Sequence, residues 1–180
     1  NFKLFFPYHQ YFDYKLTTMT NSEQCCPVFD PSPYDDKVVE WKNKLFVKDS
    51  MRTFMHMPVF GGFGKTVTRM MKTIDIAEAK IEDKDLIMLS KDPSPWKSEL
   101  YINVTKEVSG AENLKLSGVF LTKVYDGPYK DMGKWISDLK DHVKSKGKVL
   151  KQLYFYYTTC PKCAKEHGHN YVVGFAQIEK

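Results

Sequence analysis

Two segments of the chain place apolar residues at the spacing of three and four positions that is typical of one face of an amphipathic helix. The predicted helices are residues 65–79 and 129–145. Their apolar faces comprise Val67, Met70, Met71 and Ile74 in the first segment, and Met132, Ile136, Leu139 and Val143 in the second. Gly147 follows the second segment and is a typical residue at the C-terminal end of a helix.

Short runs of β-branched, aliphatic and aromatic residues, bounded by Gly, Pro or Asp, predict strands between and after these helices. The predicted strands are residues 51–59, 86–89, 99–106, 116–125, 153–158 and 171–178. Glycines 61, 62 and 64 predict one turn and Asp126-Gly127-Pro128 another, and residues 160–168 are predicted to form a loop.

The order strand, helix, strand, strand occurs twice, and the two copies align. Gly61 corresponds to Gly127, Leu86 to Leu153, and Tyr101 to Tyr171. The sequence therefore predicts an α+β fold of duplicated β-α-β-β modules, about 51–107 and 114–178, with pseudo-twofold symmetry, an antiparallel sheet and two main helices. Joining the modules would leave a crevice between the halves, and such crevices commonly hold ligands.

The N-terminal segments differ from this domain. Residues 1–18 are rich in aromatic side chains without a helix or strand period, and Met19 is followed by a polar stretch. One hypothesis takes Met19 as the native start and residues 1–18 as an upstream extension, and the rival takes them as an arm that packs on the domain or on a partner. Residues 19–50 are predicted to be a connector that carries Cys25 and Cys26, because its X-Pro pairs discourage helix.

Composition narrows the class of protein. The 180 residues are 42% hydrophobic and 27% charged, as expected for one globular domain, and the 14% of aromatic residues hints at a ligand pocket. The net charge of +5 is spread along the chain without a basic run, so we expect no nucleic-acid partner.

The chain also carries no feature that predicts a membrane or an export route. No apolar run reaches the roughly 18–20 residues of a membrane span, and no secretory signal core is visible at the start. We expect a cytoplasmic protein, a monomer or a homodimer, with reduced thiols or a metal site rather than structural disulfides.

The stretch from Tyr125 to Tyr129, between a strand and a helix that carries Trp135, resembles the Gly-Pro-Tyr signature of the GyrI-like small-molecule-binding superfamily. That fold is a duplicated β-α-β-β module. The longer strings YFYYTTCPKCAK at 154–165, NYVV at 170–173, and CCP at 25–27 leading to FDP at 29–31 resemble a stand-alone subgroup described as hydrolases.

The resemblance implies two roles. Some relatives are effector domains of bacterial transcription regulators that bind amphipathic drugs, and others stand alone and hydrolyse strained cyclopropane rings of DNA-alkylating natural products. This chain shows no helix-turn-helix segment, so we expect a detoxifying hydrolase that binds an apolar or aromatic electrophile and needs no cofactor. The alternatives are a non-catalytic binding or sequestering module and, third, a protein that binds a partner through its basic surface.

Ring opening by water needs an acid or base and a dry aromatic box. Glu99 is the first choice for the acid, because burial would raise the pKa of its carboxyl group into a useful range, and Glu107 is the second. Tyr129 and His56 complete the predicted catalytic set, although a lone histidine on such a strand is more often structural.

Aromatic residues on the predicted strands and on the second helix are candidates for the wall of the ligand site. They are Tyr101, Tyr125, Trp135, Tyr154 and Tyr156, with Trp96 as a lid at the rim. The competing interpretation is that these side chains fill the core. Drug-binding relatives carry a glutamate on the last strand, where this chain has Gln177, and we assign Gln177 to the ligand site in its place.

The four cysteines permit a metal site. Cys25, Cys26, Cys160 and Cys163 would form a four-sulfur structural zinc site that ties the connector to the loop before the last strand. A local alternative combines Cys160 and Cys163 with His167 and His169. Plain reduced thiols or a reversible disulfide remain the simplest interpretation of a single CxxC.

Overall fold

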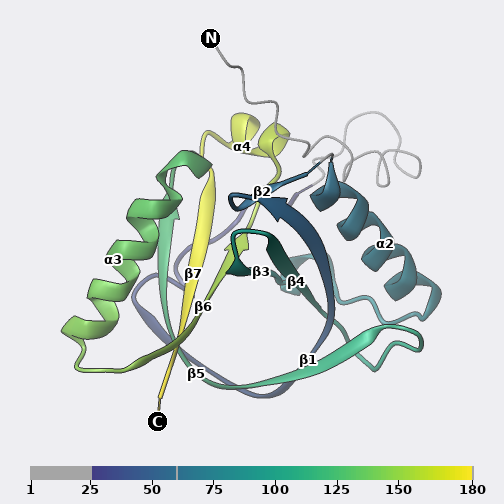
Figure 1. The fold of residues 1–180 in the computed structure, drawn as a ribbon, viewed down its shortest axis with the longest axis horizontal. Coiled ribbons are helices and arrows are strands. Elements are labelled where there is room, and N and C mark those ends of the chain that lie inside the picture. Colours follow the sequence, from purple (N-terminus) through teal and green to yellow (C-terminus); the bar gives the residue numbers. More distant parts are fainter. Residues whose placement is uncertain (1–25, 60, 180) are drawn as a thin grey trace.

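The computed structural model describes residues 26–59 and 61–179, so the predictions for residues 1–18 and for Cys25 fall outside the described residues. Its core is one antiparallel sheet that closes on itself (Figure 1). The strands follow one another in the order β1 (Lys37–Phe54), β4 (Lys97–Asn103), β3 (Met88–Ser94), β6 (Leu150–Tyr157), β7 (Tyr171–Ile178) and β5 (Glu112–Asp126). Strand β5 also pairs with β1, which completes a barrel.

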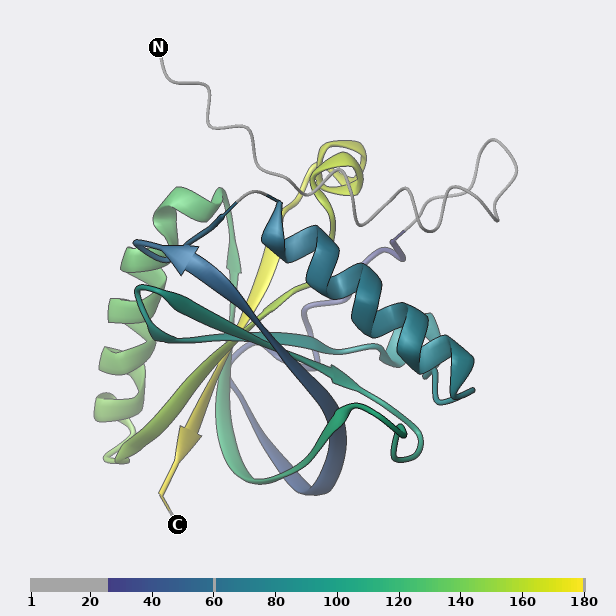
Figure 2. The same cartoon turned by 45° about the vertical axis from the view of Figure 1, so that its right-hand side comes forward.

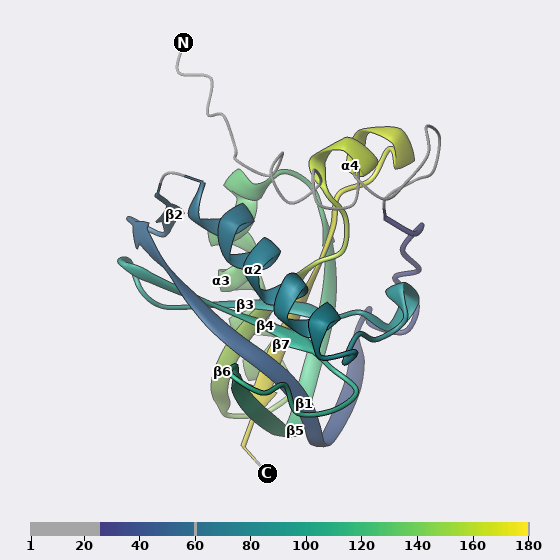
Figure 3. The same ribbon diagram turned by 90° about the vertical axis from the view of Figure 1, so that its right-hand side faces the viewer.

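The helices lie outside the barrel wall (Figures 1 and 3). Helix α2 (Gly62–Ile76) follows the short strand β2 (Met57–Pro58), and α3 (Met132–Ser145) follows the 3-10 turn η2 (Tyr129–Asp131). The short helix α4 (Pro161–His167) lies between β6 and β7, and the 3-10 turn η1 (Asp83–Asp85) precedes β3. Figure 2 shows α2 and α3 on different parts of the barrel surface.

Strand alternation divides the buried residues of the described barrel strands and main helices into three clusters. One lies between α2 and the strands β1 and β4, where Val67 and Ile74 meet Leu100 and Ile102. A second lies between α3 and the strands β5, β6 and β7. The third contains no helix residue. It is the barrel interior, and its members include Trp41, Phe46, Leu89, Tyr101, Leu116, Phe120, Tyr154, Val173 and Phe175.

Gly174 lets α3 approach the barrel closely. A Cβ built on Gly174 would lie 2.6 Å from Cδ2 of Leu139 and 3.3 Å from Cε2 of Tyr125. Leu139 is fully buried. The glycine in β7 therefore makes room for the central turn of α3, which sets the position of that helix on the sheet.

The α+β class, the antiparallel sheet and the two main helices are confirmed, with helix ends shifted by about one turn or less. The second half departs from the predicted order, because α4 lies between β6 and β7, and in the first half β2 precedes α2. The duplicated modules and their pseudo-twofold symmetry stay predictions. Among the described residues, no helix is long and apolar enough to cross a membrane.

Two local predictions were wrong. The first strand begins at Lys37 and ends at Phe54, so much of the predicted connector is strand and residues 55–59 are turn and β2. A bulge between Trp41 and Lys44, with φ 51° at Asn43, interrupts its alternation and hides it in the sequence. The predicted loop 160–168 contains α4.

Candidate functional site

A cavity of about 790 Å³ lies against the barrel wall between the N-terminal ends of α2 and α3. Strands β1, β3, β4 and β6 form its floor, and β2 and η2 add to its rim. The lining comprises Met51, Thr53, His56, Met57, Pro58, Phe63, Ser90, Lys91, Asp92, Ser98, Tyr129, Lys130, Met132, Gly133, Ile136, Leu150, Lys151, Gln152, Leu153, Phe155 and Tyr157.

Alternate residues near the ends of β6 and β1 contribute side chains to the cavity floor. On β6, Leu153, Phe155 and Tyr157 reach the cavity. On β1, Met51 and Thr53 do so, and these residues share their sheet face with the residues that pack on α2. The walls are mainly thioether, aliphatic and aromatic groups, which adapt their shape to apolar ligands.

His56 and Asp92 meet at the cavity rim. His56 lies in the two-residue turn between β1 and β2, where Met55 and His56 have φ of 50° and 66°. Positive φ at both central positions is what a tight hairpin turn of this twist requires, and it strains residues other than glycine. The His56 amide donates to Pro95 O at 2.9 Å, which ties this turn to the turn between β3 and β4.

The ring of His56 lies 3.1 Å from Asp92, measured from Nδ1 to Oδ2. Side-chain exposure is 52% for His56 and 29% for Asp92, so water screens the pair only in part. If Nδ1 carries the proton toward Asp92, then Nε2 presents a lone pair. This is the arrangement of a carboxylate-oriented general base.

Tyr129 adds a phenol to the same cavity. Burial, together with the negative charge of Asp92, raises the pKa of Tyr129. The phenol therefore stays protonated at neutral pH and can donate a hydrogen bond. Its ring lies 6.1 Å from that of Tyr157, which also lines the cavity.

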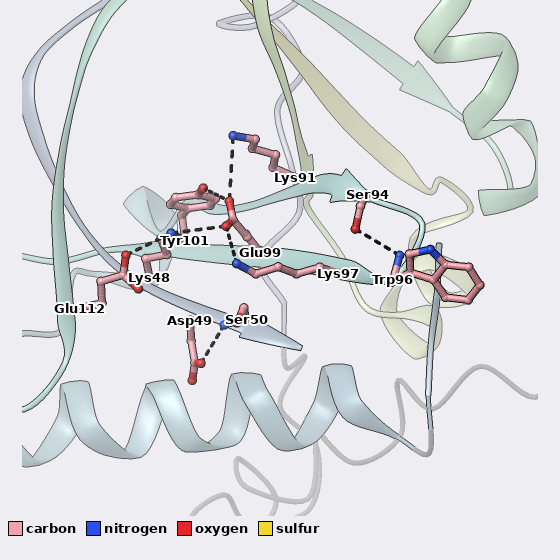
Figure 4. Close-up of polar contacts among 10 residues, drawn as sticks. All are labelled: Lys48, Asp49, Ser50, Lys91, Ser94, Trp96, Lys97, Glu99, Tyr101 and Glu112. Carbon is pink, nitrogen blue, oxygen red and sulfur yellow. Dashed lines mark hydrogen bonds and ion pairs between the residues drawn. The ribbon is translucent and has the colours of Figure 1, made fainter. Parts of the chain in front are cut away.

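Glu99 does not line this cavity. Its neighbour Ser98 does, and Glu99 points to the opposite face of β4 with Tyr101 (Figure 4). The Tyr101 hydroxyl donates to Glu99 at 2.7 Å and Lys97 donates at 3.0 Å, while Lys48 lies 3.4 Å away. Lys91 lies 4.0 Å away on the neighbouring strand.

The expectation of a raised pKa for Glu99 was wrong. Burial raises the pKa of Glu99, but the hydrogen bonds from Tyr101 and Lys97 and the charge of Lys48 outweigh it and hold the value at about 2. Glu99 is therefore ionised at neutral pH and cannot donate a proton there. Burial and, second to it, the hydrogen bond to the Glu99 carboxylate raise the pKa of Tyr101 far above its ordinary value.

The other predicted ligand-site residues lie elsewhere. Tyr154 lies in the barrel interior with Tyr101, and the partly buried Tyr156 packs against this cluster. Tyr125 on β5 stacks on Trp135 of α3 at 5.5 Å, and the Tyr125 hydroxyl donates to Asp138. None of these side chains lines the 790 Å³ cavity.

Trp96 and Gln177 also lie outside the cavity lining. Trp96 is exposed in the turn between β3 and β4 and packs edge-on against Phe54 at 5.5 Å, close to the turn that carries His56. Gln177 donates from Nε2 to Ser117 O at 3.2 Å, near Gly118 on β5. Glu107 pairs at the surface with Lys115.

The structure thus gathers His56 and Tyr129 from the predicted set and adds Asp92. Asp92 lies in the run Lys91-Asp92-Pro93, which in the sequence looks like an ordinary loop. Only the placement of the β1–β2 turn beside the end of β3 brings its carboxylate to the histidine, and a residue-by-residue pattern carries no signal for that.

Three of the four cysteines lie together at the start of α4. Cys26, Cys160 and Cys163 place their sulfur atoms within 4.8 Å of one another. A hydrogen bond from the Cys26 side chain and the backbone amide of Cys163 lower the pKa of Cys160 against the effect of burial. His169 pairs instead with Asp126, at 2.7 Å from Nδ1 to Oδ2.

Comparison with known proteins identifies the family of this chain. The family model described as bacterial hydrolase matches residues 16–178. The chain belongs to the bacterial hydrolase family. The predicted resemblance to a subgroup described as hydrolases is thereby confirmed. No curated protein matches the chain.

Solved structures share the fold at low identity. The C-terminal domain of EcmrR superposes with a TM-score of 0.65 at 12% identity, covering 82% of this chain and 98% of that chain. A hydrolase from Listeria innocua gives a TM-score of 0.56 at 10% identity, covering 81% and 92%. EcmrR in its complex with DNA gives 0.63 at 11% identity, covering 97% and 65%. At these identities the likeness shows the fold alone.

Proposed function

We propose that this bacterial hydrolase family member binds an apolar or aromatic electrophile in the cavity between α2 and α3 and adds water to it. The observation that carries the proposal is the placement of His56, Asp92 and Tyr129 on one apolar cavity. A volume of about 790 Å³ suits a drug-sized molecule. The family description and the low-identity hydrolase neighbours support hydrolysis as the reaction class.

Binding would rest on the apolar floor and the flexible walls. Phe155 and Tyr157 offer flat faces from β6, and Met51, Met57 and Met132 can repack around ligands of different outline. Among the described residues, three lysines line the cavity, and its one lining carboxylate, Asp92, is paired with His56. We therefore propose neutral aromatic compounds rather than cations as preferred ligands.

The reaction follows from the three polar groups. His56 accepts a proton from a water molecule, and Asp92 stabilises the imidazolium that forms. The hydroxide attacks a strained carbon, for example in a cyclopropane ring. The carbon–carbon bond breaks, and its electron pair moves to the electron-accepting end of the substrate, which takes the proton of Tyr129. The histidine proton returns to the tyrosinate through solvent.

A non-catalytic sequestering role is the second candidate. The more than half-exposed ring of His56 favours it, because a general base usually works in a drier place. In either role we propose a ligand-binding protein without a nucleic-acid partner, since its lysines are dispersed along the chain.

The test is to mix the full chain with a spirocyclopropyl cyclohexadienone and to follow addition of ¹⁸O-labelled water by mass spectrometry. Hydrolysis predicts catalytic formation of the ring-opened alcohol, and its loss in the His56→Gln variant. His142→Gln is the matched control, because His142 also pairs with an aspartate, Asp36 at 3.2 Å, outside the cavity. Saturable binding without turnover would refute the enzyme and leave the sequestering role.

A further inference from the structure

The cysteine cluster joins two segments that are far apart in the sequence. Cys26 precedes β1, whereas Cys160 and Cys163 belong to the start of α4, between β6 and β7. Cys160 and Cys163 are buried, and Cys26 packs against them. The cluster takes no part in the proposed reaction, because none of the three residues lines the ligand cavity.

The spacing of the sulfur atoms suits a tetrahedral soft metal ion. All three lie within 4.8 Å of one another. Zinc–sulfur bonds of about 2.3 Å at tetrahedral angles place sulfur atoms roughly 3.8 Å apart. Small side-chain rotations would therefore bring the three sulfurs onto one ion without moving the backbone.

Backbone amides already point at these sulfurs. The Cys160 amide donates to Cys26 Sγ at 3.4 Å, and the Cys163 amide donates to Cys160 Sγ at 3.3 Å. Amide donors of this kind orient thiolate ligands and offset their negative charge. Lys162 and Lys165 on the same short helix add positive charge close by.

The cluster can also be reached by an ion. Cys26 and Cys160 line a second cavity of about 80 Å³, together with residues of the chain around Thr158 and Thr159. Tyr157 lines both this cavity and the ligand cavity. An ion held here would lie beyond the C-terminal end of β6, whose last residue, Tyr157, also lines the ligand cavity.

We propose that Cys26, Cys160 and Cys163 bind one zinc ion, which fastens the segment before β1 to the loop between β6 and β7. Each thiol that ligates the metal releases its proton to solvent. A water molecule completes the tetrahedron. The local alternative with His169 loses support, since His169 is paired with Asp126 and stacked on Tyr171.

The site is tested on the full chain, reduced and freed of metal by a chelator. Titration with Co²⁺ should produce a sulfur-to-cobalt charge-transfer band and intense tetrahedral d–d bands, saturating at about one ion per chain. Zn²⁺ should abolish both bands and raise Tm, because a ligand that binds only the folded state stabilises it.

Variants then assign the ligands. Cys160→Ser and Cys163→Ser should each weaken Zn²⁺ binding about tenfold or more, whereas Ala164→Ser, a similar change beside Cys163, should bind as the unaltered chain does. Absence of the cobalt–thiolate band in the reduced, unaltered chain would overturn the proposal. So would full zinc affinity in folded Cys160→Ser and Cys163→Ser variants. The cobalt titration decides the question even if those variants fail to fold.

Discussion

Gly133 offers a way to fill the proposed ligand cavity without disturbing its walls. It belongs to α3 and lines the cavity, and a Cβ added to it would meet no atom within 4 Å. Tryptophan is more favourable than glycine inside a helix by about 0.5 kcal/mol. Gly133→Trp should therefore fold normally, with Tm raised by about 1–2 °C.

The added indole would take space that an aromatic ligand needs. Loss of about 100 Å² of apolar contact costs the ligand about 2.5 kcal/mol, which is roughly a 70-fold increase in Kd. The assay is a fluorescence titration with N-phenyl-1-naphthylamine, a neutral probe that brightens in apolar surroundings. Lys134→Trp is the control, because Lys134 is 83% exposed and outside the lining. Equal affinity in Gly133→Trp, Lys134→Trp and the unaltered chain would refute the reasoning.

Three further predictions concern the chemistry, the packing and the pH dependence. Asp92→Asn should lower kcat about tenfold, because the partly screened charge of Asp92, 3.1 Å from His56, stabilises the imidazolium by about 1–2 kcal/mol. Steady-state kinetics should show an unchanged KM. An unchanged kcat would contradict a catalytic role for the His56–Asp92 pair. Gly174→Ala should lower the free energy of unfolding by about 1–3 kcal/mol, since its methyl group would overlap Leu139; urea unfolding measures this, and an unaffected midpoint would mean that α3 can shift freely. Glu99 has a folded-state pKa of about 2 against an ordinary 4.5, so its stabilisation is complete above pH 4.5 and is lost as pH falls toward 2. The free energy of unfolding of Glu99→Gln, measured with urea, should therefore fall less steeply across that pH window than that of the unaltered chain. The affinity for the fluorescent probe should stay the same. An equal pH dependence in both proteins would show that Glu99 is not the group responsible.

The helices and most strands could be predicted because their apolar periods survive in the sequence. Val67 to Ile74 and Ile136 to Val143 keep a clean helical stripe against the barrel. The long first strand could not be predicted, because Lys42, Asn43 and Lys44 break its alternation at the bulge. Its edges pair with two different strands, which is a tertiary property without a local signature.

The candidate site could likewise be predicted only in part. His56 and Tyr129 could be proposed from residue type and place in the chain, and both reach the cavity. The sequence did not reveal which face of the sheet Glu99 occupies, because β4 is buried on both faces from Ser98 to Asn103. A strand buried on both sides gives no polar face from which to tell its orientation. Ser98 therefore meets the cavity, and Glu99 meets the lysines of the opposite face.

The central claim is that an apolar small molecule binds between α2 and α3. The most direct test is a crystal structure of the chain with brominated N-phenyl-1-naphthylamine, in which the anomalous signal locates the bromine. The account predicts a peak inside the cavity, against Phe155 and Met132. A peak only in the barrel interior beside Tyr101, or only at the exposed pair Phe54 and Trp96, would contradict it.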